Sequence, residues 1–263
     1  MPPSPSPTSA PNTTSPVRVD APPTTRRVSI ITPAYREAEN LPELISRIAP
    51  LRLSPHHLDL ELIIVNDESG DDTAAVVRSA AQPWVRLLTR STERGLSSAV
   101  VHGLNSSRHD YLIVMDADLS HPPESIPKLL DALDEGAAFA FGSRYIRGGS
   151  TDDRWTLPRA LNSRVATLLA RPLTDLKDPM SGFFALRRET LAATAPLNPV
   201  GYKIGLELLV KSRVAKSRAR PAVEVPIHFA SRTRGESKLT IREKLLYLIH
   251  LSRMLRFQLT KPE

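Results

Sequence analysis

The stretch YLIVMDADLSHPPE, residues 111–124, places two carboxylates directly after a buried strand. Its residues 112–115 are all apolar, which is typical of a strand that a parallel sheet buries on both faces. Asp116 and Asp118 follow at once, separated by one residue. Because ligands of open α/β sheets bind at the carboxyl ends of the strands, this stretch predicts both the kind of fold and the position of a site.

Short apolar segments of this kind recur along the chain, with helical segments between them. We expect strands over 28–31, 60–65, 85–88, 111–115 and 137–143, and helices over 40–51, 71–81, 96–107 and 123–136. The first helix begins with Asn40 as its N-cap, Pro42 in its first turn and Glu43 at N3. Strands that alternate with helices predict an α/β fold, a mostly parallel sheet flanked by helices.

The chain beyond Arg144 is less regular. We expect helices within 154–173 and 201–217, a strand followed by a helix over 181–194, a strand over 223–229 and a long helix at the end. Residues 1–26 hold 8 of the 24 prolines and little apolar surface, so a disordered Pro/Ser/Thr-rich tail is expected there. The predicted division is therefore this tail at 1–26, an α/β domain at 27–239 and an amphipathic helix at 240–263.

The amino-acid composition excludes several kinds of site and favours certain kinds of ligand. The 263 residues include no cysteine, which excludes disulfides, thiolate metal sites and a cysteine nucleophile. The net charge of +7 favours anionic ligands, and without an RNA-recognition or helix-turn-helix signature we expect phosphorylated ligands or a membrane surface rather than nucleic acid. No segment approaches the ~20 apolar residues of a spanning helix, and the start of the chain is not a secretory signal. We therefore expect a cytoplasmic protein, soluble or peripheral on the cytoplasmic face of a membrane.

Two other strand ends also carry polar side chains. Tyr35 and Glu37 follow the first expected strand, and Asn66 and Asp67 follow the second. The carboxylates at these ends would face one crevice together with the Asp-x-Asp pair. Such oxygen ligands suit Mg²⁺ or Mn²⁺, which a substrate diphosphate could bridge. The alternative for each loop is a solvated acidic segment.

Several other site classes are excluded by missing motifs. The sequence contains no G-x-x-x-x-G-K-[ST] and no G-x-G-x-x-G after the first strand, so neither a P-loop nor a dinucleotide site is expected. It also lacks a G-x-S-x-G elbow and any H-x-x-x-H spacing, which argues against serine hydrolases and zinc enzymes.

Seven segments in order resemble glycosyltransferase family 2, and within it the polyprenol-phosphate (dolichol-phosphate) mannose synthases. They are VSIITPAYREAENL, IIVNDESGDDT, RGLSSAVVHGL, VMDADLSHPPE, FGSRY, DPMSGFFALRRE and VPIHFASRTRGESKL. The resemblance implies a GT-A (Rossmann-like) fold. It also implies an inverting transfer of mannose from GDP-mannose to a polyprenyl phosphate, which gives polyprenyl phosphate β-mannose.

The resemblance further implies roles for individual residues. It assigns the sugar nucleotide to Pro33, Tyr35, Glu37, Asn66, Asp67, Arg94 and Asp116, and the metal to Asp116, Asp118 and Ser120. It assigns the phosphates of donor or acceptor to Arg144, Arg159, Ser163, Arg232 and Lys238. These four basic residues and Asp118 form the expected catalytic set. Because the acceptor phosphate is already anionic at neutral pH, the set must hold two anions together rather than supply a strong base. Glu207 would orient one of the basic groups or cap the core.

Two positions depart from the family pattern. Asn66 stands in place of the first aspartate of the usual pair, and it can hydrogen-bond a base or ribose without adding charge. Ser120 stands where many relatives have a glutamine that binds the metal. Its shorter hydroxyl is expected to reach the metal less well and to leave room for a water.

The last segment, TIREKLLYLIHLSRMLRFQLTK, is amphipathic and basic. Its apolar residues at helical spacing are Ile241, Leu245, Leu248, Ile249 and Leu255, and its basic residues are Arg242, Lys244, Arg253, Arg256 and Lys261. Such a helix could lie in a membrane interface and bring the site to its lipid. The alternatives are packing on the core or on a partner subunit, which includes a membrane-anchoring partner.

Three other functions are weighed against mannose transfer. Transfer of glucose from UDP-glucose, or of another sugar, to the same lipid keeps every motif, because none of them sets the sugar. A nucleotidyltransferase would need a glycine-rich loop after the first strand, and TPAYREAEN has no glycine. A non-catalytic binding module is disfavoured because both aspartates and the basic motifs are present.

Overall fold

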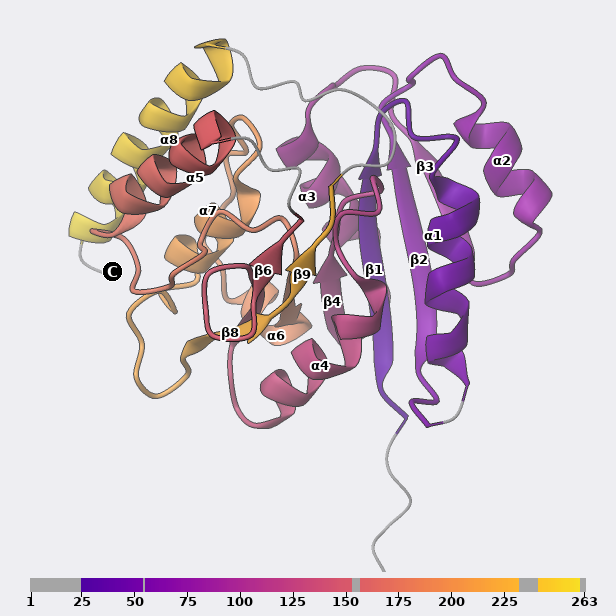
Figure 1. The fold of residues 1–263 in the computed structure, drawn as a ribbon, viewed down its shortest axis with the longest axis horizontal. Helices are drawn as coiled ribbons and strands as arrows, with labels where there is room; N and C mark the ends of the chain where they lie inside the picture. Colours follow the sequence, from indigo (N-terminus) through magenta and orange to yellow (C-terminus); the bar gives the residue numbers. More distant parts are fainter. Residues whose placement is uncertain (1–24, 54, 153–156, 232–240, 261–263) are drawn as a thin grey trace, which may run out of the picture.

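The computed structural model describes residues 25–53, 55–152, 157–231 and 241–260 (Figure 1), with backbone alone at 157–160 and 241–244. The strands are β1 (Arg27–Ala34), β2 (Asp59–Asn66), β3 (Val85–Thr89), β4 (Tyr111–Val114), β5 (Phe139–Ser143), β6 (Ser150–Thr151), β7 (Phe184–Arg187), β8 (Ala222–Pro226) and β9 (His228–Phe229). The α-helices are α1 (Leu41–Ile48), α2 (Thr73–Ala80), α3 (Leu96–Ser106), α4 (Ile126–Asp134), α5 (Leu157–Ala170), α6 (Arg188–Ala192), α7 (Ile204–Lys211) and α8 (Ile241–Leu259). Two short 3₁₀ helices are η1 (Ala49–Arg52) and η2 (Pro123–Ser125).

The main sheet has seven strands in the order β3-β2-β1-β4-β7-β5-β8. The pairs β1·β2, β1·β4, β2·β3 and β5·β8 are parallel, whereas β7 runs antiparallel to both of its neighbours. Strand order reverses between β1 and β4, and this is the place where an open α/β sheet offers a crevice to ligands. The expected mostly parallel α/β fold is confirmed.

Helices cover both faces of the sheet because the strands are apolar on both faces. On one face α1, α2 and α4 pack against side chains such as Ile30 and Leu62. On the other face α3 and α7 pack against Ile31, Ile63 and Phe184. These side chains are fully buried, and each buried large apolar side chain contributes about 1.5–3 kcal/mol relative to exposure.

A third layer lies outside α7. There α5 and α8 run side by side at the left of Figure 1. Tyr247, Leu251 and Met254 of α8 are buried against α7 and the end of α5, and the Tyr247 hydroxyl donates to the Ala166 carbonyl at 2.6 Å. The expected C-terminal helix therefore buries one of its faces on the rest of the chain.

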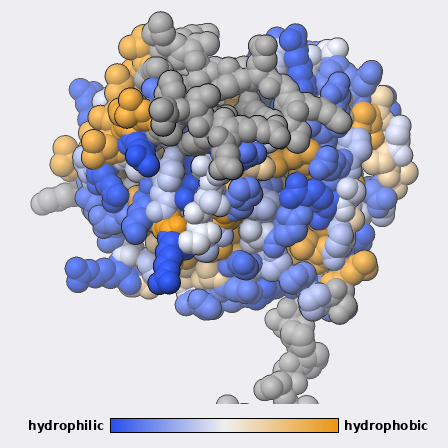
Figure 2. Space-filling model, in the orientation of Figure 1, coloured by the Kyte–Doolittle hydropathy of each residue, from blue (hydrophilic) through white to orange (hydrophobic). Residues whose placement is uncertain are grey.

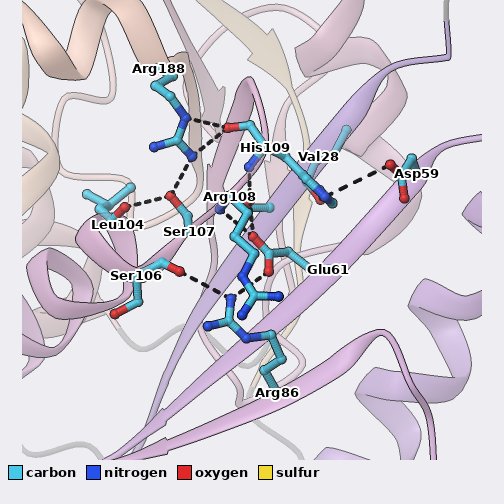
Figure 3. Close-up of polar contacts among 11 residues, drawn as sticks. Val28, Asp59, Glu61, Arg86, Leu104, Ser106, Ser107, Arg108, His109 and Arg188 are labelled. Atoms are coloured by element: carbon cyan, nitrogen blue, oxygen red, sulfur yellow. Dashed lines mark hydrogen bonds and ion pairs between the residues drawn. The ribbon is translucent and has the colours of Figure 1, made fainter.

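A polar cluster ties the strands together near their amino ends (Figure 3). The carboxylate of Glu61, inside β2, accepts hydrogen bonds from the Ser29 hydroxyl, the Arg108 backbone N–H and Arg86, each at 2.6 Å. Burial alone would raise the pKa of Glu61, but these hydrogen bonds bring it below its ordinary value. The cluster thus joins β1, β2, β3 and the loop before β4 at the edge opposite the polar strand ends.

Two local expectations were wrong in detail. Asn40 does precede α1, but its side chain makes no capping hydrogen bond and instead donates to Glu37 at 2.6 Å. The expected single strand over 223–229 is divided, because Ile227 donates to the Ser143 carbonyl and the chain then passes from β8 into the β6·β9 pair. The expectation of a disordered tail falls mostly outside the described residues.

Candidate active site

The register of the strands brings the polar strand ends together. Ala34 of β1 pairs with Asn66 of β2, so the loops that follow both strands start side by side. Val114 of β4 lies between Ile31 of β1 and Phe184 of β7. Because β7 is antiparallel, the loop that precedes it enters at the carboxyl edge of β4, which places residues 178–183 next to the Asp-x-Asp loop.

The Asp-x-Asp loop is held tightly from within. Asp118 is buried, and its Oδ1 accepts hydrogen bonds from the backbone N–H of Ser120 at 3.1 Å and from the Ser120 hydroxyl at 2.5 Å. Leu119 adopts a left-handed backbone with a φ of 63°, a conformation that costs about 1–3 kcal/mol and often marks functional loops. In this geometry Ser120 contacts Asp118, while Asp116 remains partly exposed.

The buried His121 side chain also supports the Asp-x-Asp loop. Its Nδ1 accepts the backbone N–H of Asp116 at 3.1 Å, and its ring stacks on Phe183 at 5.4 Å and meets the edge of Phe229 at 5.3 Å. Burial lowers the pKa of His121, against the opposing effect of the nearby carboxylates, so the imidazole is neutral. A neutral ring with Nδ1 as acceptor fixes the position of Asp116.

Gly182 lies directly against the Asp-x-Asp loop. A Cβ at this position would lie 3.3 Å from Asp116 Oδ2 and 3.4 Å from the His121 ring, which is tighter than most side chains tolerate. The absence of a side chain lets residues 178–183 approach the carboxylates closely.

The donor set fits a divalent metal that also binds substrate. Within the described ranges, no group of three His, Cys, Asp or Glu side chains could hold an ion alone. Asp116 and Asp118 offer oxygens only, and Mg²⁺ is commonly held by one or two carboxylates with substrate phosphates and waters. The pair therefore suits Mg²⁺ or Mn²⁺ with oxygens from a diphosphate.

At the end of β2, the Asp67 side chain is held by residues of the loop between β3 and α3. Its Oδ1 accepts from Arg90 Nε at 2.7 Å and Oδ2 accepts the Gly95 N–H at 2.8 Å. Arg90 is buried as well and also donates to the Ser98 hydroxyl at 3.0 Å. This pair shapes the loop before α3, in which Arg94 is exposed at the edge of the site.

Asn66 is buried beside this pair. Its Oδ1 accepts the Ser69 hydroxyl at 2.8 Å, so a contact with a base or ribose would fall to its amide NH₂ group. Pro33, Tyr35 and Glu37 continue from the end of β1 and are all partly exposed. The structure thus brings the expected nucleotide-binding residues to adjacent loops.

Arg144 follows β5 and is clamped by a buried carboxylate. Its Nε and Nη2 each donate to Asp178 at 2.7 Å, and its backbone N–H donates to the same carboxylate at 3.0 Å. Glu224 of β8 in turn accepts the backbone N–H groups of Lys177 and Asp178, both at 2.8 Å. The clamp uses two of the five N–H groups of the guanidinium and fixes its plane.

Other expected phosphate-binding residues lie at the border of the described chain. Ser163 of α5 accepts the Tyr145 hydroxyl at 2.8 Å, which links α5 to the loop of Arg144. Arg232 and Lys238 are outside the described residues, as is the side chain of Arg159.

Of the two roles expected for Glu207, the contacts favour the one in the core. Glu207 is a buried residue of α7, and its Oε1 accepts Lys211 Nζ at 2.7 Å and the Asn198 N–H at 2.6 Å.

Sequence reasoning missed four residues that shape the site: His121, Asp178, Arg90 and Lys203. Arg90 follows the end of β3, so the same argument from strand ends would have found it. Asp178 lies in the quoted segment DPMSGFFALRRE and Lys203 in the helix expected within 201–217, but neither had an assigned role. Their positions at the site depend on β7 running antiparallel, which no local pattern shows.

Comparison with known proteins identifies the family. The sequence model named Glycosyl transferase family 2 matches residues 29–193. The chain belongs to this family. It is 42% identical over 237 residues to a dolichol-phosphate mannosyltransferase of Pyrococcus furiosus, a match that covers 88% of the chain and 64% of the relative. It is 41% identical to a dolichol-phosphate mannosyltransferase of Saccharomyces cerevisiae, covering 88% of the chain and 87% of the relative.

A more distant relative agrees with this family membership, and a solved structure agrees with the fold. The polyprenol monophosphomannose synthase of Mycolicibacterium smegmatis is 34% identical, over 84% of the chain and 85% of the relative. Glucosyl-3-phosphoglycerate synthase from Mycobacterium tuberculosis, solved with Mn²⁺, UDP and phosphoglyceric acid, superposes with a TM-score of 0.66 at 22% identity. That superposition covers 90% of the chain and 80% of the solved structure, and it confirms the GT-A fold.

Proposed function

We propose that this family 2 member transfers mannose from GDP-mannose to a polyprenyl phosphate, with inversion at the sugar. The observation that carries the proposal is the 41–43% identity, over 88% of the chain, to proteins named dolichol-phosphate mannosyltransferase. The site supports it with paired carboxylates at the sheet edge and a clamped arginine beside them.

The reaction needs one bond to form and one to break. An anionic oxygen of the acceptor phosphate attacks the anomeric carbon, and the bond from that carbon to the donor's diphosphate oxygen breaks, which releases GDP. A Mg²⁺ or Mn²⁺ ion held by Asp116 and Asp118 would neutralise charge on the departing diphosphate. The loops with Asn66, Asp67 and Arg94 would hold the nucleoside and its phosphates.

The chain's own groups must bring two anionic substrates together. Arg144 is pre-oriented by Asp178, and a guanidinium in a fixed plane suits phosphate oxygens. Arg159, Ser163, Arg232 and Lys238 are proposed to bind the acceptor phosphate with it. Asp118, held by Ser120, is the carboxylate on which metal-dependent transfer depends most directly.

The proposal also places the chain on a membrane surface. Exposed apolar side chains gather on α5 and α8, at the upper left of Figure 2. They are Leu161, Val165, Leu168 and Leu169 of α5, and Leu245, Leu248, Ile249, Leu255 and Leu259 of α8. No helix in the described parts of the chain is long and apolar enough to span a bilayer. We therefore propose that this α5–α8 face enters the interface of an anionic membrane, aided by Arg253 and Arg256.

Membrane binding is tested with the α5–α8 face. Leu168→Glu and Leu248→Glu should each reduce sedimentation with anionic lipid vesicles, because a charge must then enter the apolar boundary. Leu53→Glu is the matched control, since Leu53 is 66% exposed, close to the 69% of Leu168, but lies directly after η1. Equal binding of all variants would contradict the membrane role, and vesicle-independent association of the chain would favour a protein partner.

Transfer itself is tested at the Asp-x-Asp pair. Asp118→Asn should abolish Mn²⁺-dependent transfer of mannose from GDP-mannose to polyprenyl phosphate while the fold is retained. Glu124→Gln is the control, because Glu124 is an exposed carboxylate of the same segment that pairs with Arg47. Full activity of Asp118→Asn would refute the proposed site.

A further inference from the structure

Lys203 lies in the wall of a small cavity beside the Asp-x-Asp loop. Its lining includes Asp116, Ser181, Gly182, Tyr202 and Lys203. It lies where α7 begins, at the carboxyl edge of the sheet and close to where the reacting groups would meet.

The ammonium of Lys203 is not neutralised by a carboxylate. It donates one hydrogen bond, to the Met180 carbonyl at 2.8 Å, and lies 4.5 Å from the Tyr202 ring centre. Among the described residues it forms no ion pair within 4.0 Å, and Asp178 and Asp116 act on it only by attraction at longer range. Lys211 on the same helix differs, because its ammonium ends on Glu207 at 2.7 Å.

The pKa of Lys203 depends on its burial and on the charged groups around it. Burial and the nearby charge of Arg144 lower the pKa of Lys203 to about 8, against the opposing effects of Asp178 and Asp116, so the group is mostly charged at neutral pH. Arg144 is already matched by Asp178. Among the described residues, Lys203 is therefore the cation of the cavity lining, and it has no carboxylate partner within ion-pair distance.

We propose that Lys203 binds a phosphate oxygen of the reacting substrates in the cavity that it shares with Asp116. The proposal rests on the proposed transfer reaction. An ammonium has three N–H donors, and the Met180 carbonyl uses one, which leaves two that a phosphate oxygen can accept. The oxygen comes either from the donor's diphosphate or from the acceptor's phosphate, since both are oxyanions that meet at this edge.

Labelling of the unmodified protein tests the proposal without a variant. Lysines are acetylated briefly with an amine-reactive reagent, and the extent at Lys203 and at Lys128 is compared by mass spectrometry. Lys128 is an exposed lysine of α4 and serves as the internal control. We expect at least fivefold protection of Lys203, with Lys128 unchanged, by GDP with Mn²⁺ if the donor supplies the oxygen, or by farnesyl phosphate if the acceptor does. Protection by neither would overturn the proposal.

Two substitutions separate binding from a structural role. Lys203→Gln keeps a donor for the Met180 carbonyl but removes the charge, and Lys203→Arg keeps the charge. Binding predicts at least a tenfold loss in GDP affinity or a tenfold rise in the KM for polyprenyl phosphate with Lys203→Gln, and a smaller effect with Lys203→Arg. Equal losses in both variants together with a lowered Tm would assign Lys203 a structural role and overturn the proposal.

The outcomes for the lysine and for the proposed sugar transfer remain distinct. The labelling uses GDP and farnesyl phosphate and requires no turnover. Protection of Lys203 in a protein that does not transfer mannose would uphold the phosphate contact and refute the assigned donor sugar. Transfer of mannose without protection of Lys203 would uphold the assigned donor sugar and refute the phosphate contact.

Discussion

Replacement of Asp178 by asparagine should destabilise the fold and disturb the site together. The Asp178 side chain is fully buried, and the Arg144 side chain is 9% exposed. Asparagine keeps the shape and one acceptor oxygen, but it turns an amide donor toward a guanidinium that can only donate. Removal of one partner of a buried ion pair costs about 3–5 kcal/mol, so we expect a loss near the lower end, about 3 kcal/mol.

The assay is urea-induced unfolding with linear extrapolation, paired with transfer kinetics. Glu189→Gln is the control, because Glu189 and Arg220 form an exposed pair with side chains 66% and 51% exposed. Such pairs contribute only about 0–1 kcal/mol. The Asp178 variant should also raise the KM for polyprenyl phosphate, since Arg144 loses its fixed plane. A stability loss no greater than that of Glu189→Gln would refute the argument that this clamp is a buried, mutually dependent pair.

Three further predictions concern other parts of the chain. The pKa of Glu61 is lowered in the folded state, so the stabilisation that its charge provides is fully present above the unfolded pKa and is lost as the pH falls through the folded pKa (Figure 3). The native protein should therefore exceed Glu61→Gln in free energy of unfolding by less at pH 3 than at pH 6. A difference that stays constant with pH would contradict this. Gly103→Ala should lower stability by about 1–3 kcal/mol in thermal unfolding, because its Cβ would lie 2.5 Å from Ile31 Cγ2, and an unchanged Tm would contradict the close packing of α3 on β1. His121→Leu should weaken Mn²⁺ affinity by roughly tenfold, whereas His121→Asn should retain more of it by offering an acceptor to the Asp116 N–H, and equal affinities would show that this hydrogen bond does not position the carboxylate.

The sequence predicted the regular part of the fold because its signals are local. Alternating apolar runs and helical periods located β1 to β5 and α1 to α4 within a few residues. The antiparallel direction of β7 was not predicted, because the sequence of a four-residue strand does not indicate in which direction it runs or with which strands it pairs. The division of residues 223–229 between two sheets was missed for the same reason, as it depends on pairing with Ser143 and with β6.

The candidate site shows the same limit. Asp116 and Asp118 were predicted as site residues because they directly follow a strand. Locating that strand in the sequence was enough to place them at the sheet edge. Asp178 and Lys203 come from segments 60 or more residues further along the chain, and they reach the site only through the insertion of β7. Residues that act through long-range pairing are therefore visible in the structure and not in the sequence pattern.

The central claim is that the donor sugar is mannose carried by GDP. It is tested most directly by offering the purified protein radiolabelled GDP-mannose and UDP-glucose in parallel, each with Mn²⁺ or Mg²⁺ and a polyprenyl phosphate. Label that enters the organic phase from GDP-mannose alone is the predicted result. Label from UDP-glucose alone would keep the fold, the carboxylate pair and the lipid acceptor, and would contradict the proposed mannosyl transfer.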